Sequence, residues 1–236
     1  EIILKILKKF KIKIISSDGT YRQIKKLGYK CNEISKFTNS SEILEGRVKT
    51  LHPKIHAGIL NKRSNKLHKK QMKSKKYENV DLVIVNFYPF EKTLSKTNNH
   101  KSIIENIDIG GPALVRAAAK NYNDVTIITN IEQYIELIAE LNKNKGSTSI
   151  KFRQKLSEEA FASTAYYDSI IAGYFTNRAK NIFPKKKFIH GNLIEKLRYG
   201  ENPHQEAAIY SFNKSLDIVQ LHGKKLSYNN FKKNFI

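Results

Sequence analysis

Five side chains could together bind an anionic molecule and move protons on it. Each lies beside a turn with Gly or Pro, or at a strand end: Arg47, Lys49, Tyr88, Asp108 and Lys120. A guanidinium and an ammonium two residues apart can hold a phosphate or a carbonyl oxygen. Asp108 precedes two glycines, which leave room for a ligand close to the backbone. A partly desolvated lysine such as Lys120 can exchange protons, because burial lowers its pKa. Spacing alone leaves open whether these residues form one site or are solvated loop charges.

Other kinds of site find less support. His52 and His56 are four residues apart, but Pro53 between them disfavours a helical pair, and no third ligand lies nearby. Zinc sites need three or four ligands at set spacing, so we predict no metal. The chain also lacks a Walker lysine motif, a GxGxxG motif and a Ser-His-Asp order.

The elements that must position these residues alternate between strand and helix. An apolar helix face at 1–10, a strand at 11–16 and a helix through residue 27 come first, and a long loop then carries residues 46–53. The turn between that strand and the second helix resembles the phosphate-binding turns of α/β proteins. A nearly continuous apolar run at 80–87 predicts a strand covered on both faces. A helix at 113–121, a strand at 125–129 and a helix at 131–142 complete a parallel, doubly wound sheet, whose ligands bind at the carboxyl ends of the strands.

The remaining third of the chain differs in character. A helical extension begins at about residue 147. It is mainly helical at 152–176, where the expected apolar stripe is Phe161, Ala165, Ile170 and Phe175. Residues 184–187 indicate a linker, followed by a strand at 207–212. We therefore predict one domain at 1–182 and the truncated start of a second α/β domain at 183–236. Because the chain begins at Glu1 without a Met, we also expect that an upstream piece is missing.

Charge and composition limit the partners. The chain has 43 Lys and Arg against 21 Asp and Glu, a formal charge of +22, but nearly all its basic residues are Lys. Nucleic-acid interfaces favour Arg and stacking aromatics, so we interpret the Lys excess as solvated surface, with attraction of a polyanion as the alternative. The single cysteine, Cys31, cannot form an internal disulfide, which favours a cytoplasmic location. No apolar run reaches 18 residues, so we predict no membrane span.

Three long motifs carry a resemblance to a known family. They are Gly46-Arg-Val-Lys-Thr-Leu-His-Pro-Lys-Ile-His-Ala-Gly-Ile-Leu, Asn86-Phe-Tyr-Pro-Phe and Glu105-Asn-Ile-Asp-Ile-Gly-Gly-Pro-Ala-Leu-Val-Arg-Ala-Ala-Ala-Lys-Asn. Together they resemble the bifunctional purine-biosynthesis family, which joins an IMP cyclohydrolase domain to an AICAR transformylase domain. Arg198-Tyr-Gly-Glu-Asn-Pro-His-Gln and Leu226-Ser-Tyr-Asn-Asn are similar to the opening of its transformylase half.

The resemblance implies a fold and an activity. The fold is a methylglyoxal-synthase-like α/β parallel sheet with flanking helices and a helical extension, followed by the beginning of a second α/β domain. The activity is closure of 5-formamidoimidazole-4-carboxamide ribonucleotide to IMP with loss of water, which needs no metal or cofactor. The full-length protein would also be the AICAR formyltransferase, with 10-formyltetrahydrofolate as cofactor. A purine ribonucleotide substrate and a homodimer are implied as well.

The resemblance also implies roles for residues. Lys120 corresponds to the proton donor or acceptor, Tyr88 to a supporting position, and Arg198 and Tyr199 to AICAR binding. The expected nucleotide contacts are Ser17, Asp18, Gly19, Thr20, Arg47, Val48, Lys49, Thr50, Val85, Asn86, Asp108, Ile109 and Gly110. We expect Lys49 to stabilise charge on the formyl oxygen, with Asp108 and Tyr88 orienting groups, but sequence does not divide the roles of Lys49 and Lys120.

The chain departs from the family pattern in three places. Position 18 usually holds Gly in the family, and here it is Asp18. The family's first phosphate turn would lie upstream of Glu1, and the catalytic Lys-His pair of the transformylase beyond Ile236. A non-catalytic nucleotide-sensing domain of the same fold stays open as the alternative. Such a domain would not need Lys49, Tyr88, Asp108 and Lys120 together.

Overall fold

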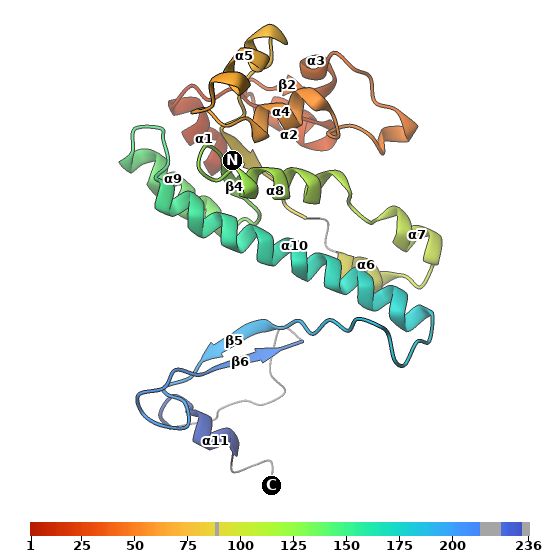
Figure 1. Cartoon of the computed structure of the whole chain (residues 1–236), viewed down its shortest axis with the longest axis vertical. Coiled ribbons are helices and arrows are strands. Elements are labelled where there is room, and N and C mark those ends of the chain that lie inside the picture. Colours follow the sequence, from red (N-terminus) through yellow and green to blue (C-terminus); the bar gives the residue numbers. More distant parts are fainter. Residues whose placement is uncertain (88–89, 213–222, 233–236) are drawn as a thin grey trace. The chain divides into compact units, whose positions relative to one another are not determined.

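The computed structural model describes residues 1–87, 90–212 and 223–232. The chain divides into two compact units, Glu1–Ile171 and Ala172–Ile236. The long helix α10 (Ile150–Arg178) begins in the first unit and ends in the second. Figure 1 gives the order of the elements.

Two parallel strand pairs form the sheet structure of the first unit. Strand β1 (Ile15–Ser16) pairs with β2 (Asn32–Glu33), and β3 (Leu82–Ile84) pairs with β4 (Thr126–Ile128). The parallel α/β fold expected from the sequence is confirmed. The strands are shorter than the apolar runs that predicted them, because only the residues opposite a partner form the ladder. One further bond, from the Val85 N–H to the Ile128 carbonyl at 2.9 Å, continues the β3–β4 pair toward the carboxyl end of β3.

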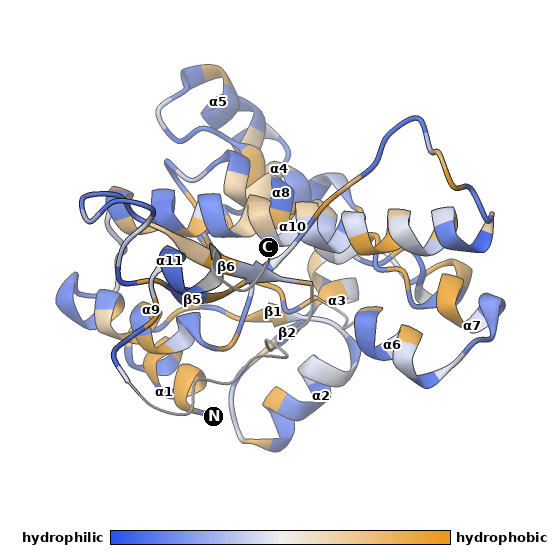
Figure 2. Ribbon diagram, turned by 90° about the horizontal axis from the view of Figure 1, so that it is seen from below, coloured by the Kyte–Doolittle hydropathy of each residue, from blue (hydrophilic) through white to orange (hydrophobic). Residues whose placement is uncertain are grey.

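Helices surround these strands. In the first unit they are α1 (Ile2–Lys9), α2 (Asp18–Lys26), α3 (Ile34–Thr38), the 3-10 turn η1 (Leu44–Gly46), α4 (Pro53–Leu60), α5 (Lys66–Ser74), α6 (Phe90–Lys96), α7 (His100–Glu105), α8 (Gly110–Lys120), α9 (Gln133–Lys143) and most of α10. Helix α5 carries mainly hydrophilic residues, in keeping with the predicted solvated Lys surface (Figure 2). Helix α8 begins at Gly110, three residues before the expected start at residue 113.

The loop expected at 46–53 is present over residues 47–52, but α4 begins inside its expected end, at Pro53. Pro53 is the first residue of α4, where its fixed φ favours a helix and its missing N–H costs nothing. His52 precedes it as the N-cap, and its Nδ1 accepts a hydrogen bond from the Lys54 N–H at 3.1 Å. His56 then lies in the helix. Among the described residues, no three His, Cys, Asp or Glu side chains form a group that could hold a metal ion.

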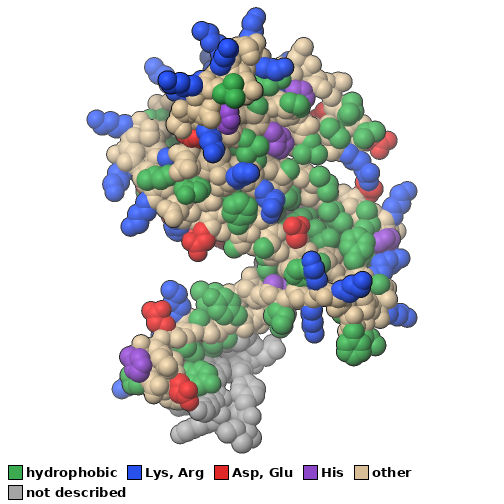
Figure 3. Space-filling view, viewed as in Figure 1, with side chains coloured by type: hydrophobic (Ala, Val, Ile, Leu, Met, Phe, Trp, Pro, Cys, Tyr) green, Lys and Arg blue, Asp and Glu red, His purple; other side chains and the backbone are tan. Residues whose placement is uncertain are grey.

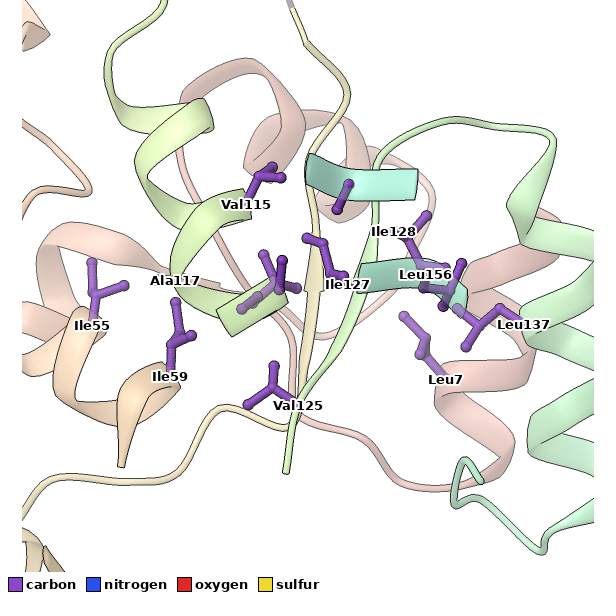
Figure 4. Packing of buried hydrophobic residues seen from close by; sticks show 14 of the residues in the cluster. Leu7, Ile55, Ile59, Val115, Ala117, Val125, Ile127, Ile128, Leu137 and Leu156 are labelled. Atoms are coloured by element: carbon purple, nitrogen blue, oxygen red, sulfur yellow. The ribbon is translucent and has the colours of Figure 1, made fainter. Parts of the chain in front are cut away.

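The core lies on both sides of the β3–β4 pair. Figure 4 shows Ile127 and Ile128 of β4 between two sets of helices. On one side are residues of α4 and α8, and on the other are residues of α1, α9 and α10. The completely buried members include Val115, Ile127, Ile128, Leu137 and Leu156. The strand predicted at 125–129 is buried as expected, whereas in β3 Val83 is buried and Leu82 and Ile84 are half-buried. Because the two strands are parallel, their carboxyl ends lie at the same edge of the pair.

Helix α10 packs on α8 with a different face from the one predicted. Phe161 and Phe175 of the expected stripe are exposed, whereas Leu156, Ala160 and Tyr167 are buried. The buried face also carries polar atoms that bond to both ends of α8. Ser157 Oγ donates to the Ala119 carbonyl at 2.8 Å. The prediction considered apolar side chains alone, so it missed a face that is buried partly for its hydrogen bonds.

In the second unit, the described elements are an antiparallel strand pair and a short helix. Strand β5 (Asn192–Lys196) pairs with β6 (Ala208–Ser211), and α11 spans Tyr228–Lys232. The strand predicted at 207–212 is present as β6, whereas β5 was not predicted. Asn192-Leu-Ile-Glu-Lys has two adjacent apolar residues and two adjacent charged ones, so it lacks the alternation that indicates a strand.

Surface features of the described residues agree with the charge analysis. Lys and Arg side chains are spread over the face of the first unit that Figure 3 shows, and they do not gather in one patch there. None of the helices described here is both long and apolar enough to cross a membrane.

Candidate active site

Lys49 is the best-buried candidate cation, and two carboxylates hold it. Its ammonium forms a salt bridge with Asp18 and lies 3.5 Å from Glu42 Oε2. The Lys49 side chain is 25% exposed, compared with 43% for Asp18. The hydrogen bond with Lys49 lowers the pKa of the Asp18 carboxyl, and the same bond raises the pKa of the Lys49 ammonium. Lys49 is therefore a fixed positive charge at neutral pH.

The partner of Lys49 stands at the N-terminus of α2. Asp18 is the first residue of that helix and has a left-handed φ of 45°, a conformation that Asp tolerates better than most residues do. Ser17 precedes it in extended conformation, and Gly19 and Thr20 are exposed in the first turn. The first N–H groups of a helix have no partner within the helix and favour an anion. The phosphate turn predicted from the sequence therefore has suitable local geometry, with Lys49 beside it.

A second turn, Asp108–Gly111, begins α8. The Gly111 N–H donates to Asp108 Oδ1 at 2.9 Å, so the carboxylate folds over the start of the helix. A β-carbon at position 111 would lie 2.2 Å from Asp108 Oδ2, and one at 110 would lie 2.5 Å from Thr50 Oγ1. The two glycines thus make room for Asp108 and Thr50. The sequence predicts that this room is for a ligand, whereas here protein atoms fill it. Ile109, between Asp108 and Gly110, is exposed.

One loop contacts both of these turns, and it carries Arg47, Val48, Lys49 and Thr50. Arg47 forms an exposed salt bridge with Glu105, which raises the pKa of the guanidinium and lowers that of the carboxyl. Val48 and Lys49 line a cavity of about 40 Å³. Thr50 lies against Gly110.

The end of β3 supplies the third part of the site. Val85 bonds to β4, and Asn86 Nδ2 donates to the Tyr134 hydroxyl at 3.4 Å. Phe87 stacks on Tyr167 of α10, with ring centroids 5.4 Å apart. Tyr88, a predicted supporting residue, lies outside the described residues.

The structure does not bring Lys120 to this cluster. Lys120 is exposed at the last position of α8, and Gly110 is the first. At 1.5 Å per residue, the ten steps between them span about 15 Å. The contacts with α10 agree, because Ala119 lies at Ser157 and Asp108 lies at Tyr167, ten residues further along. A lysine side chain cannot bridge that distance, so Lys120 does not contact Asp108 within one copy of the chain, and its role in proton transfer stays a prediction.

The two AICAR-binding candidates belong to the second unit. The Arg198 guanidinium lies over the Tyr199 ring at 4.9 Å. The Arg198 N–H donates to the Leu226 carbonyl at 2.8 Å, and the Tyr228 N–H donates to the Tyr199 carbonyl at 3.1 Å. The two sequence motifs that resemble a transformylase are therefore joined by backbone hydrogen bonds.

Three residues of the site were not predicted. Glu42 and Glu105 pair with the candidate cations, and Tyr167 bonds to the Asp108 backbone. The two glutamates flank known motifs in sequence but carry no local signal of pairing. Tyr167 had one signal, since a tyrosine in a buried helix face needs a partner for its hydroxyl.

Comparison with known proteins supports one class. Residues 2–113 match the family model described as MGS-like domain, and residues 118–234 match the one described as AICARFT/IMPCHase bienzyme. The fold is also similar to that in the crystal structure of ForH, with a TM-score of 0.66 and 27% identity, over 74% of this chain and 92% of that chain. The first half of the chain therefore matches an MGS-like α/β domain, and the second half matches the family model of the bienzyme.

Two curated relatives make the assignment more specific. The chain is 45% identical to the bifunctional purine biosynthesis protein PurH of Bradyrhizobium diazoefficiens, over 93% of this chain and 42% of that protein. It is 48% identical to PurH of Persephonella marina, over 96% of this chain and 45% of that protein. The chain belongs to the bifunctional purine biosynthesis family. It spans less than half the length of these relatives.

Proposed function

We propose that this chain is the IMP cyclohydrolase part of a bifunctional purine-biosynthesis enzyme. Its substrate would be 5-formamidoimidazole-4-carboxamide ribonucleotide. The carboxamide nitrogen attacks the formyl carbon, a C–N bond forms, and the nitrogen loses a proton. The formamido nitrogen loses a second proton as its C=N bond forms and the C–O bond breaks, so the formyl oxygen leaves with both protons as water and the purine ring of IMP remains. Ring closure within one bound molecule gains most from holding the substrate folded.

Lys49 is the cation that stabilises negative charge on the formyl oxygen during attack. The raised pKa of its ammonium keeps it charged at neutral pH, which suits electrostatic stabilisation and not proton abstraction. Its low exposure strengthens the interaction, because less water screens the charge.

Asp108 orients the carboxamide. Its Oδ1 already accepts the Gly111 N–H, so the carboxylate has a fixed direction, and its second oxygen can accept a hydrogen bond from the amide nitrogen. Val85, Asn86, Ile109 and Gly110 would contact the base. Tyr88 remains a proposed supporting residue.

The phosphate binds at the N-terminus of α2, over Ser17, Asp18, Gly19 and Thr20, with Arg47 at the opposite side. Arg47 pairs with Glu105 and Lys49 pairs with Asp18 in this structure. Substrate must therefore displace these carboxylates to contact the two cations. Val48 and Thr50 support this loop from within. We assign Lys120 no role beside Asp108 in its own copy, because about 15 Å of α8 separates it from Gly110, and its part in proton transfer stays a prediction.

The finer family properties are also proposals for this chain. Arg198 and Tyr199 would bind AICAR in a complete transformylase domain, which would use 10-formyltetrahydrofolate. A homodimer in the cytoplasm, with no nucleic-acid or membrane partner, fits the family. No described feature favours the alternative of a nucleotide-sensing domain.

One observation carries the proposal: Lys49 and the Asp108 turn are joined by the Thr50–Gly110 contact. The test is ultraviolet detection of IMP formation from the formylated ribonucleotide by the purified 236-residue chain, with Lys49→Ala as its paired variant. IMP formation by the wild type and its loss in the variant are expected. Tight IMP binding without turnover would instead identify a sensing domain.

A further inference from the structure

A buried tyrosine on α10 contacts two loops of the candidate site, and the proposed reaction does not yet use it. Tyr167 is 5% exposed. Its hydroxyl accepts a hydrogen bond from the Asp108 N–H at 2.9 Å. Its ring stacks on Phe87 with 14° between the planes, and it meets Phe90 edge-on with centroids 6.1 Å apart. One side chain therefore contacts the chain after β3 and the turn before α8.

We infer that Tyr167 is a positioning residue for ring closure, which acts by holding Asp108; this inference rests on the cyclohydrolase function proposed above. Asp108 is fixed at two points. Tyr167 holds its backbone N–H, and the Gly111 N–H holds its carboxylate. Since Gly110 packs on Thr50, the same turn also determines where the Lys49 loop lies.

The hydroxyl and the ring of Tyr167 make separate contacts with the site. Burial raises the pKa of the hydroxyl, so it stays neutral and can accept from the Asp108 N–H. Without that acceptor, a partly buried N–H would lose its partner, and the turn would have to shift to reach water. The ring supports Phe87 and Phe90 by stacking, which is independent of the hydroxyl. Tyr167→Phe therefore removes the hydrogen bond and keeps the stacking.

A tyrosine that only fills the core would behave differently. Its loss would lower the free energy of unfolding, and any effect on the rate would be independent of the carboxylate of Asp108. A positioning residue acts through that carboxylate. Its effect must then disappear when the carboxylate is already neutralised, which a double-mutant cycle detects.

The experiment compares the wild-type chain with Tyr167→Phe, Asp108→Asn and the double variant, by IMP formation in single-turnover assays. Tyr166→Phe is the matched control, because its hydroxyl lies on the same helix but bonds to Glu91 at 2.5 Å. Tyr167→Phe is expected to lower kcat about tenfold and to change KM less than about threefold. In the Asp108→Asn background, it should cost less than about twofold. Tyr166→Phe should leave kcat within about twofold of wild type.

Amide exchange gives a second measurement that does not need turnover. The Asp108 amide should exchange at least about tenfold faster in Tyr167→Phe and unchanged in Tyr166→Phe. A kcat within twofold of wild type, or a tenfold loss that persists beside Asp108→Asn, would overturn the inference. If the wild-type chain forms no IMP, the proposed function fails and the catalytic part of the inference with it. Unchanged exchange at Asp108 in Tyr167→Phe would show that Tyr167 does not hold the turn.

Discussion

Gly110 lies so close to Thr50 that a β-carbon at position 110 would be 2.5 Å from Thr50 Oγ1 and 3.9 Å from Thr50 Cβ. The first distance is a collision and the second is an ordinary contact. The N-terminus of α8 therefore lies against the Thr50 hydroxyl of the loop that carries Lys49.

The Gly110–Thr50 contact makes a prediction about stability. Gly110→Ala should lower the free energy of unfolding by about 1–3 kcal/mol, because the added methyl group forces the two segments apart. Thr50→Ala removes the colliding oxygen, so the double variant should recover most of the loss. Urea unfolding of the four chains measures this. A double variant no more stable than Gly110→Ala would mean that the methyl group collides with something other than Thr50.

Lys49 and Lys120 make a prediction about the division of roles. Lys49→Ala should slow IMP formation by about 10²-fold or more, because it removes the cation at the developing oxyanion. Lys120→Ala should slow it less than tenfold, since about 15 Å of helix separates Lys120 from Gly110. The rate constants of both variants are measured in one assay. Equal losses would show that Lys120 reaches the substrate from a second copy or after a rearrangement, and proton transfer would then belong to Lys120.

Much of this site could be predicted from particular residues, and the limits have physical causes. The apolar run at 80–87 predicted a strand, which is present as β3, and Asp108 before two glycines predicted a turn, which is present at the start of α8. Sequence spacing could not show that α8 separates Lys120 from Asp108. The two residues belong to one sequence motif, but the helix between them places them about 15 Å apart along its axis. Spacing could not show the Glu42, Glu105 and Tyr167 contacts either. Those residues lie on other elements, and only the packing of α7 and α10 brings two of them in.

The Asp18–Lys49 salt bridge makes a prediction about pH. Lys49 lowers the pKa of Asp18, so the pair stabilises the fold above the unfolded pKa of about 3.9, and this contribution is lost as pH falls through the folded value. Because Asp18 is 43% exposed, the contribution should be no more than about 1 kcal/mol. Asp18→Asn should therefore be less stable than wild type at pH 6, and the two chains should become equally stable as pH falls through the lowered pKa of Asp18.

Salt gives the control for this pH prediction. The difference in unfolding free energy at pH 6 should shrink between about 0.1 and 1 M salt, because screening weakens an exposed pair. A difference that persists in acid and in high salt would come from the backbone conformation of Asp18 and not from its charge.

Asp18 also makes a prediction about ligand affinity. Its carboxylate forms a salt bridge with the Lys49 ammonium. This salt bridge lies at the N-terminus of α2, where we place the substrate phosphate. A phosphate bound beside this carboxylate is repelled by it, at a cost of about 1 kcal/mol, since water and salt reduce the repulsion. Asp18→Gly should thus bind IMP about fivefold more tightly than wild type at low salt, and the gap should narrow as salt rises. Isothermal titration calorimetry measures both affinities.

Asp18→Asn separates charge from backbone freedom in that experiment. Asn also tolerates the left-handed φ of 45°, so it removes the charge without the added flexibility of glycine. If the carboxylate is the obstacle, Asn and Gly should tighten IMP binding alike. If only Gly does, the phosphate requires a closer approach of the backbone, and the side chain at 18 obstructs it by its size. If neither variant differs from wild type at low salt, the phosphate does not bind at the N-terminus of α2, and our placement of Ser17–Thr20 in the site is wrong.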